Sequence, residues 1–526
     1  MSMTYNRTSS RGKWTIMQYL RDFDLMIAFA YALRESPQDL TESNLLSVLG
    51  KLQSQGVYTP TSKHPCKDAA KAEKNINTAN FRIIQISWYM FGYYDKNQSN
   101  THRQFVFSPL GNLLLDNIDD KLKAAKIFIT MLFSLPFKQH FSHMNNSFNL
   151  YPYRLVFHLL CDQRLDGKIF ADELFYLVFF VKSISASEYE DLVNDILEFR
   201  KMSSAEKLKL FKKNEGVIAL SLQESKYFCG MLQSAGIVQW DIKKGTIGSL
   251  VQGEQTNRHA KKPTSRAYKL SYIKINSDVL PYVKKLLSKY PYTDIPYIED
   301  ELQGTFENDV VIRMYNFYPP ELVDEIGLSG KTSDKIQKML AVVKQIEPHA
   351  SNEDGDKTGK NFEYILKDVF NLFCDVDAEK IGGSGNTDLE CIYYPTPSST
   401  LKFDVEAKSR KNRLLDVLPK RLEKHRAKIG SKYTIIIAPN YASGVLDDIA
   451  DAPNIVLKSS VFSQYMAQYI LSSAKKSTKF RISYTFLHHL ACEHFGQDMT
   501  NALYSYIIKT FGHNIVPQPA CAIEER

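Results

Sequence analysis

The chain has 526 residues, of which 44% are hydrophobic and 24% charged, and it carries a formal net charge of +8. A chain of this length exceeds what one hydrophobic core serves, so about two to four domains are expected. The positive excess is mild, so it permits binding to nucleic acid without demanding it.

Cysteine usage and hydropathy narrow the class of protein further. The seven cysteines are scattered and include no C-x-x-C pair, which excludes a disulfide framework and a structural zinc site. The first residues lack the apolar core of a secretory signal. No apolar stretch approaches the roughly 20 residues that a membrane-spanning helix needs. We therefore expect a soluble, cytoplasmic protein with no membrane partner.

The first 290 residues predict three helix-rich subdomains that resemble winged helices, at residues 1–120, 121–200 and 201–290. In each of them an amphipathic helix leads into a turn marked by glycine, and extended sequence follows. This order of elements is typical of small DNA-binding modules. The alternative is ordinary helical packing that happens to include such turns.

The subdomain at 201–290 has the most complete pattern. Ser221 and Glu224 have the spacing of a capping box, which predicts that a helix begins there. Gly236 then suits the position after a helix end, and a strand is expected to follow it. A basic loop separates this strand from a second one, Tyr268 to Ile275, in which apolar and polar residues alternate. Helix, strand, basic loop and strand is the order of a winged helix.

Basic side chains in this half are candidates for contacts to double-stranded DNA. A loop wing rich in lysine and arginine would contact phosphates or a groove, although a solvated surface is the alternative for such a loop. The candidates are four residues of the loop and its edge, one on the preceding helix and three near the N-terminus: Arg258, Lys261, Lys262, Arg266, Lys226, Arg7, Arg11 and Lys13.

Residues 291–334, rich in proline and tyrosine, predict a linker, and the pattern changes after it. A helix is expected at 361–373, strand-like sequence at 381–394 and 401–411, a basic helix at 418–429 and a buried strand at 432–439. Helices alternating with strands predict an α/β domain with a mixed sheet, at residues 335–526.

Acidic and basic side chains converge in the two strand-like segments of this domain. Glu406 and Lys408 lie two residues apart, so they emerge on the same face of a strand. If Asp388 lies on the neighbouring strand, its carboxylate joins them. Two carboxylates at one site suit Mg²⁺, which polarises a phosphate oxygen and activates a bound water, while the lysine orients that water or stabilises developing charge. Hydrolysis of a phosphodiester needs this combination.

The run GGSGNTD followed by FDVEAK resembles the signature of the PD-(D/E)XK nuclease superfamily, and more closely the cleavage domain of FokI-like type IIS restriction endonucleases. The resemblance implies that Asp388 and Glu406 are metal ligands and Lys408 is the catalytic lysine. It also implies that the carbonyl of Ala407 adds a ligand. Thr387 stands where the signature has proline.

The resemblance places a further acid in the preceding helix, and Glu363 fits that position as a weaker catalytic candidate. It also implies N-terminal winged-helix recognition subdomains. The expected activity is that of a type IIS-like restriction endonuclease, which recognises a double-stranded sequence and cuts at an offset from it. Because one such site cuts one strand, a double-strand break implies a transient homodimer of catalytic domains or a partner subunit.

Other functions remain open at this stage. Within the nucleases, the alternatives are a modification-dependent or type IIP enzyme, a strand-specific nickase, and a repair or transposition nuclease. In another class, the chain could be a non-catalytic DNA-binding regulator with a relic nuclease fold. The intact set of Asp388, Glu406 and Lys408 argues against the regulator.

Overall fold

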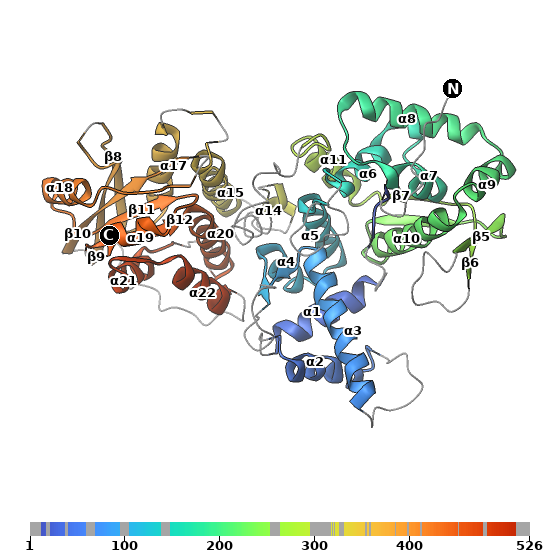
Figure 1. Cartoon of the computed structure of the whole chain (residues 1–526), viewed down its shortest axis with the longest axis horizontal. Helices are drawn as coiled ribbons and strands as arrows, with labels where there is room; N and C mark the ends of the chain where they lie inside the picture. Colours follow the sequence, from blue (N-terminus) through green and yellow to red (C-terminus); the bar gives the residue numbers. More distant parts are fainter. Residues whose placement is uncertain are drawn as a thin grey trace. The chain divides into compact units, whose positions relative to one another are not determined.

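The computed structural model divides the chain into two compact units, Met1–Phe317 and Tyr318–Arg526. We describe each unit by itself (Figure 1). The structure describes the following residues: 12–16, 22–36, 40–58, 69–94, 105–137, 148–252, 263–294, 317, 319, 321–325, 331–352, 355–356, 359–383, 385–396, 399–410, 413–450, 452–476 and 481–511. No helix in this part of the chain is long and apolar enough to cross a membrane.

The N-terminal unit begins with helices that pack around one small hairpin. Its elements are α1 (Phe23–Arg34), α2 (Glu42–Ser54), α3 (Ala69–Trp88), β1 (Gly92–Tyr93), β2 (Val106–Phe107), α4 (Pro109–Leu115) and α5 (Lys121–Ser134). Two glycines allow very close packing here. A Cβ atom on Gly92 would lie 2.1 Å from the Val106 carbonyl oxygen, and one on Gly111 would lie 2.1 Å from that of Phe91. Neither position therefore accepts a side chain.

The second part of this unit is a set of helices around a three-stranded antiparallel sheet. Its elements are α6 (Pro152–Cys161), the 3₁₀ turn η3 (Gln163–Leu165), β3 (Ile169–Phe170), α7 (Ala171–Tyr176), the 3₁₀ turn η4 (Val178–Phe180), α8 (Ala186–Lys201), α9 (Ser204–Lys212), α10 (Glu215–Ser234), β4 (Val238–Ile242), β5 (Gly248–Gln252), β6 (Thr264–Tyr268), β7 (Ser271–Ile275) and α11 (Leu280–Leu287). The strands of the sheet lie in the order β3, β7, β4, and β5 pairs with β6 as a separate hairpin.

This sheet joins segments from both sides of residue 200. Ile169 of β3 pairs with Ile273 of β7, and β7 pairs along its length with β4. The predicted second and third subdomains therefore contribute strands to one sheet. Helices α7 and α10 pack together beside this sheet.

The predicted start of the helix at Ser221 is wrong. Helix α10 already begins at Glu215, so Ser221 lies in its second turn, is fully buried and donates its hydroxyl to the Phe175 carbonyl at 2.7 Å. The capping-box spacing was misleading because the apolar run before it, Val217 to Leu220, continues the helix. The predicted end was right, since Gly236 has a φ of +71° just beyond the helix.

The predicted strand Tyr268 to Ile275 is two strands. β6 ends at Tyr268 and pairs with β5, whereas β7 begins at Ser271 and pairs with β4. The alternation of apolar residues continues through the break, so the pattern alone does not reveal it.

The C-terminal unit is an α/β structure around a six-stranded mixed sheet, as expected for its fold class. Its helices are α14 (Glu321–Glu325), α15 (Lys331–Val343), α16 (Ile346–Ala350), α17 (Lys360–Phe370), α18 (Pro419–Ile429), α19 (Gly444–Ile449), α20 (Ser459–Lys476), α21 (Thr485–Glu493) and α22 (Thr500–Phe511). Its strands are β8 (Val376–Lys380), β9 (Leu389–Thr396), β10 (Ser399–Ala407), β11 (Thr434–Ala438), β12 (Asn454–Lys458) and β13 (Gln497–Asp498).

The sheet order is β13, β12, β11, β10, β9, β8. Strands β8, β9 and β10 are antiparallel neighbours, and β10 to β13 run parallel. The helix expected at 361–373 and the strands expected at 401–411 and 432–439 are confirmed, with ends that differ by several residues. The strand expected at 381–394 is partly wrong, because its first eight residues form a loop between β8 and β9.

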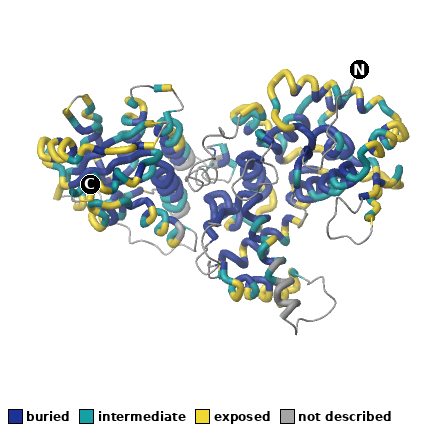
Figure 2. The backbone as a smooth tube through the Cα atoms, in the orientation of Figure 1, coloured by how far each residue is buried: buried dark blue, intermediate teal, exposed yellow. Residues whose placement is uncertain are grey.

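The two faces of the sheet carry different side chains. On one face, apolar side chains of β11 and β12 pack under α18 and α19 in a cluster of buried residues: Leu414, Val417, Leu422, Ile436, Ala438, Val445, Ile449 and Val456. On the other face, the Phe403 ring stacks on Tyr484 at a centroid distance of 4.7 Å and on Tyr433 at 5.4 Å. Figure 2 shows that burial concentrates in the strands, while α18 and α8 carry many exposed residues.

Candidate active site

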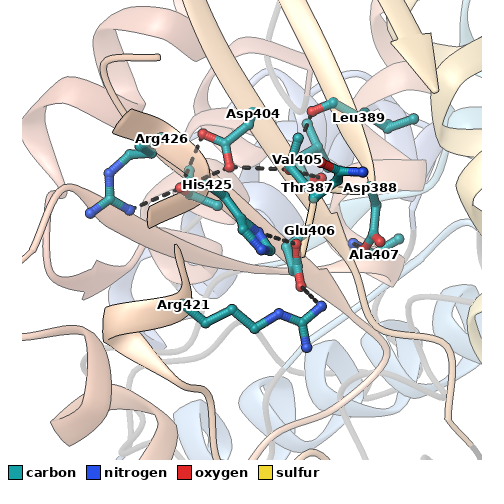
Figure 3. A network of polar contacts seen from close by, with 12 residues as sticks. Thr387, Asp388, Leu389, Asp404, Val405, Glu406, Ala407, Arg421, His425 and Arg426 are labelled. Atoms are coloured by element: carbon teal, nitrogen blue, oxygen red, sulfur yellow. Dashed lines mark hydrogen bonds and ion pairs between the residues drawn. The ribbon is translucent and has the colours of Figure 1, made fainter. Parts of the chain in front are cut away.

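The predicted acidic pair meets where β9 and β10 lie side by side. The pairing of Val405 with Leu389 places Asp388, immediately before β9, next to the C-terminal end of β10. There one carboxylate oxygen of Asp388 accepts a hydrogen bond of 2.8 Å from the Ala407 backbone N–H (Figure 3). The spacing of 18 residues across the turn thus places Asp388 beside Glu406, as the sequence predicted.

The loop before Asp388 depends on glycine. Gly382, Gly383 and Gly385 have φ values of +58°, +86° and +81°, a region that residues with a Cβ rarely adopt. The Gly382 N–H donates to the Thr387 carbonyl at 3.0 Å, and this turn leads the chain back into β9. The glycine-rich lead-in of the motif therefore has a structural reason, since it allows a tight loop next to the acid.

Glu406 and Lys408 point to the same side of the sheet. The Lys408 ammonium donates to Oε1 of Glu406 at 2.6 Å, and the glutamate side chain is 1% exposed. The Lys408 side chain is 21% exposed. A buried carboxylate thus lies under a lysine that still reaches solvent.

Two residues of α18, which the sequence analysis did not single out, face the same carboxylate (Figure 3). Nη2 of Arg421 lies 3.7 Å from Oε1 of Glu406, and Nδ1 of His425 lies 4.0 Å from Oε2. His425 is 1% exposed. Burial lowers the pKa of His425 although the charge of Glu406 opposes this change, so the imidazole is neutral at pH 7. Their spacing of four residues on a helix was the available signal, because it places both on one face.

Polar atoms at this site lack partners within the described residues. Oε2 of Glu406 and both ring nitrogens of His425 are buried and make no hydrogen bond. Burial, the charge of Glu406 and that of Glu363 raise the pKa of Asp388 to about 7, while Lys408 and the Ala407 N–H act in the opposite direction. A buried carboxylate oxygen without a partner is costly in a folded protein, so this cluster favours a positively charged ligand.

Glu363 lies in the first turns of α17, at the edge of this cluster. Its carboxylate pairs with the ammonium of Lys380 on β8 at 2.8 Å. Its negative charge reaches Asp388, since it contributes to the raised pKa of that residue. No group of three or more His, Cys, Asp and Glu side chains among the described residues is arranged to hold a metal ion.

A buried polar network holds the strands behind the site. Asp404 is fully buried and accepts hydrogen bonds from Ser431 at 2.5 Å and from Thr434 at 3.0 Å. The Thr387 hydroxyl lies 3.2 Å from the same carboxylate. Burial raises the pKa of Asp404 to about 6, although these hydrogen bonds oppose the change. Thr387, which stands where the motif has proline, thereby ties the loop that carries Asp388 to β10.

The structure places the N-terminal DNA-binding candidates differently. Lys13 is 4% exposed and forms a buried ion pair with Glu224 of α10, so its predicted role in binding phosphate is wrong. Lys226 donates to the Ala267 carbonyl at 3.1 Å, and Arg266 lies on β6 with Nη2 at 3.4 Å from Gln252. The remaining candidates lie outside the described residues: Arg7, Arg11, Arg258, Lys261 and Lys262.

Comparison with known proteins identifies the family. The family model for the N-terminal domain of the type II restriction endonuclease HgaI matches residues 9–290. The type II restriction enzyme HgaI of Avibacterium volantium is 32% identical over 500 residues, which are 95% of this chain and 98% of the relative. Two solved structures of the restriction endonuclease FokI, one of them bound to DNA, share 11% identity and cover 93% of this chain and 100% and 99% of theirs. Their TM-scores of 0.26 and 0.27 are too low to support an argument about the arrangement of the chain.

These relatives and the acidic site define a type II restriction endonuclease, a site-specific deoxyribonuclease. More particularly, the chain belongs to the HgaI family of these enzymes. The restriction endonuclease predicted from the sequence is thereby confirmed, and the non-catalytic regulator is disfavoured.

Proposed function

We propose that the chain is a type IIS-like restriction endonuclease that uses Mg²⁺ to hydrolyse DNA at Asp388, Glu406 and Lys408. The observation that carries this proposal is the convergence of the two carboxylates and the lysine at the adjoining ends of β9 and β10. The two carboxylates come from different strands, and the lysine is the member with a solvent-exposed part. A phosphate group in solution can therefore reach the lysine.

The donor set fits a hard divalent cation. Asp388 and Glu406 would hold it, with the Ala407 carbonyl as the further ligand that the sequence predicted, and Glu363 would act from the rim of the site. The buried Glu406 oxygen without a partner and the raised pKa of Asp388 support this fit. Oxygen ligands with incomplete protein coordination suit Mg²⁺, which keeps several waters. When bound, the cation would supply Lewis-acid activation of a phosphate oxygen and of a water.

The chain's own residues have separate tasks in this proposal. Lys408 stabilises negative charge that develops on the phosphate, because its ammonium lies at the solvent-facing side of the buried carboxylate. The Ala407 N–H fixes the Asp388 carboxylate in place. The Thr387 and Asp404 contacts keep β9 and β10 in register behind the site. None of these tasks requires a large movement of the sheet.

We propose that the N-terminal unit recognises the DNA sequence. The elements α6, β3, α7, α10, β4, the hairpin β5–β6 and β7 follow the order of one winged helix with a long insertion at α8 and α9. This interpretation replaces the two separate subdomains predicted at 121–200 and 201–290. The hairpin corresponds to the wing, and the loop at its tip contains Arg258, Lys261 and Lys262. Lys226 and Arg266 flank the base of that hairpin, and Arg7 and Arg11 remain candidates.

Recognition and cleavage in separate units imply cutting at an offset from the recognised sequence. One active site in each chain also implies that both strands are cut either by two copies that pair transiently or with a partner subunit. We place the enzyme in the cytoplasm, where it would meet unmodified DNA.

The test is digestion of a plasmid library in Mg²⁺ and in EDTA, with sequencing of every new end. Ends at a constant distance from one shared sequence, formed only with Mg²⁺, support the proposal. Ends inside a symmetric sequence would identify a type IIP enzyme, and single-strand breaks a nickase. Cutting that requires methylated DNA would identify a modification-dependent enzyme, and cutting at branches or ends a repair or transposition nuclease.

A further inference from the structure

Helix α18 has two faces of different chemistry. Its buried face carries Leu422, His425 and Arg426 against the sheet. The opposite face exposes Lys420, Lys424 and Lys428, at intervals of four residues. Since the rise of a helix is about 1.5 Å for each residue, these ammonium groups follow one another in steps of about 6 Å along the helix. They form a basic row beside the sheet.

This basic row borders the active site at two points. Arg421 of the same helix is half-exposed and lies 3.7 Å from Glu406. Near the other end of the helix, the Lys428 ammonium donates at 2.5 Å to Asn386, two residues before Asp388. The row thus runs past both strands that supply the catalytic acids.

The basic row has little to neutralise it within the protein. Lys420 and Lys424 form no ion pair among the described residues, and Glu423 is the single acidic residue of α18. Helix α18 begins at Pro419 and ends before Gly430, whose φ of +71° terminates it. The row does not take part in stabilising this helix through internal ion pairs. Its charge is available for a partner.

We propose that α18 binds the DNA backbone in the cleavage complex, with Lys420, Arg421, Lys424 and Lys428 holding phosphates of the strand that is cut. Several regularly spaced cations beside a site for phosphodiester hydrolysis match the charge of a DNA strand. A second copy of the chain fits this face less well, because two-fold pairing would bring the same basic row against itself. This inference rests on the proposed cleavage function and deepens it.

The experiment compares the variant Lys420→Gln/Lys424→Gln with a matched control, Lys338→Gln/Lys509→Gln. Both variants remove two positive charges from exposed positions of the C-terminal unit, and the control positions lie on α15 and α22. Single-turnover cleavage of saturating target DNA is measured for the full-length proteins in Mg²⁺ between about 50 and 200 mM salt. Footprinting in EDTA measures recognition separately, and thermal unfolding shows whether the variants are folded.

Each phosphate contact contributes about 0.9 to the slope of log affinity against log salt. Two lost contacts therefore lower the salt dependence of the cleavage rate by roughly tenfold over this fourfold salt range. We expect the α18 variant to cut more slowly, with this weaker salt dependence and an unchanged footprint, and we expect the control to match the wild type.

Other outcomes would overturn the inference. An α18 variant with the wild-type rate and salt dependence would show that the row does not contact DNA. A variant whose slow cleavage recovers completely at high protein concentration would place α18 between copies of the chain. Wild-type protein that fails to cut any DNA would instead contradict the proposed function itself, so the two failures are distinguishable.

Discussion

Replacing Asp388 with asparagine should make the metal-free protein more stable while abolishing cleavage. Asparagine keeps an oxygen for the Ala407 N–H, which donates to Asp388 at 2.8 Å. It removes the negative charge that lies beside Glu406. The site residues of an enzyme are arranged for activity rather than for stability, so the two properties are expected to change in opposite directions.

The magnitude follows from the raised pKa of Asp388. The pKa rises from the ordinary 3.8 to about 7, and each pH unit of such a change corresponds to about 1.4 kcal/mol. Above pH 7 the cost of ionised Asp388 is therefore at most about 4 kcal/mol. Partial exposure of the side chain and the charge of Lys408 reduce this cost, so we expect a gain of about 1–3 kcal/mol for Asp388→Asn.

The gain must depend on pH in one direction. Because the folded-state pKa lies above the unfolded value, the wild-type protein loses free energy of unfolding as the pH rises from about 4 through about 7. The variant does not ionise at this position and loses nothing. The difference in free energy of unfolding between variant and wild type is therefore small near pH 4.5 and complete near pH 8.

The assay is urea unfolding in EDTA at several pH values, followed by the same series in Mg²⁺. The exposed carboxylate of Asp368 on α17 supplies a matched control, Asp368→Asn, whose stability should equal that of the wild type. In saturating Mg²⁺ the order should reverse, since a ligand at 100 times its Kd stabilises the native wild type by about 2.7 kcal/mol. A destabilised Asp388→Asn protein at pH 8, or a gain that does not change with pH, would refute the reasoning.

The remaining predictions concern residues around the two units. Asp404→Ala should cost about 2–4 kcal/mol of unfolding free energy, because it leaves buried hydroxyl groups without their acceptor; chemical denaturation measures this, and a neutral result would contradict the network. Lys13→Ala should cost about 3–5 kcal/mol by leaving Glu224 buried and unpaired, and the salt dependence of DNA binding by the folded fraction should stay at the wild-type value. Phe403→Ala should cost about 3–5 kcal/mol in thermal unfolding. Gly111→Ala should reduce the yield of folded protein, because its Cβ would lie 2.1 Å from a backbone oxygen; a fully folded variant would contradict the close packing.

The catalytic residues could be predicted because their placement depends on local rules. The two-residue period of a strand fixes Glu406 and Lys408 on one face. The glycines before Asp388 and the short turn to β10 keep β9 next to it. These features are contained in fewer than 30 consecutive residues, so the sequence pattern is enough.

Contacts between distant segments could not be predicted in the same way. The Asp404 network brings Thr387, Ser431 and Thr434 together from three segments. His425 lies against Glu406 only because α18 packs on that face of the sheet. Lys13 was expected at the surface because it lies in a polar N-terminal stretch, but it is buried against α10 by contacts over 211 positions in the chain. Local pattern carries no information about such pairings.

The central claim is that the chain cuts DNA with the carboxylate–lysine site of the C-terminal unit. The most direct measurement compares wild-type protein with Glu406→Gln on the same target DNA, by cleavage in Mg²⁺ and by footprinting in EDTA. The account predicts that the variant gives the wild-type footprint and cuts at least about 10³ times more slowly, because a metal-binding carboxylate beside the reacting phosphate is lost. A Glu406→Gln protein that cuts at the wild-type rate would contradict the account and place the chemistry elsewhere in the chain.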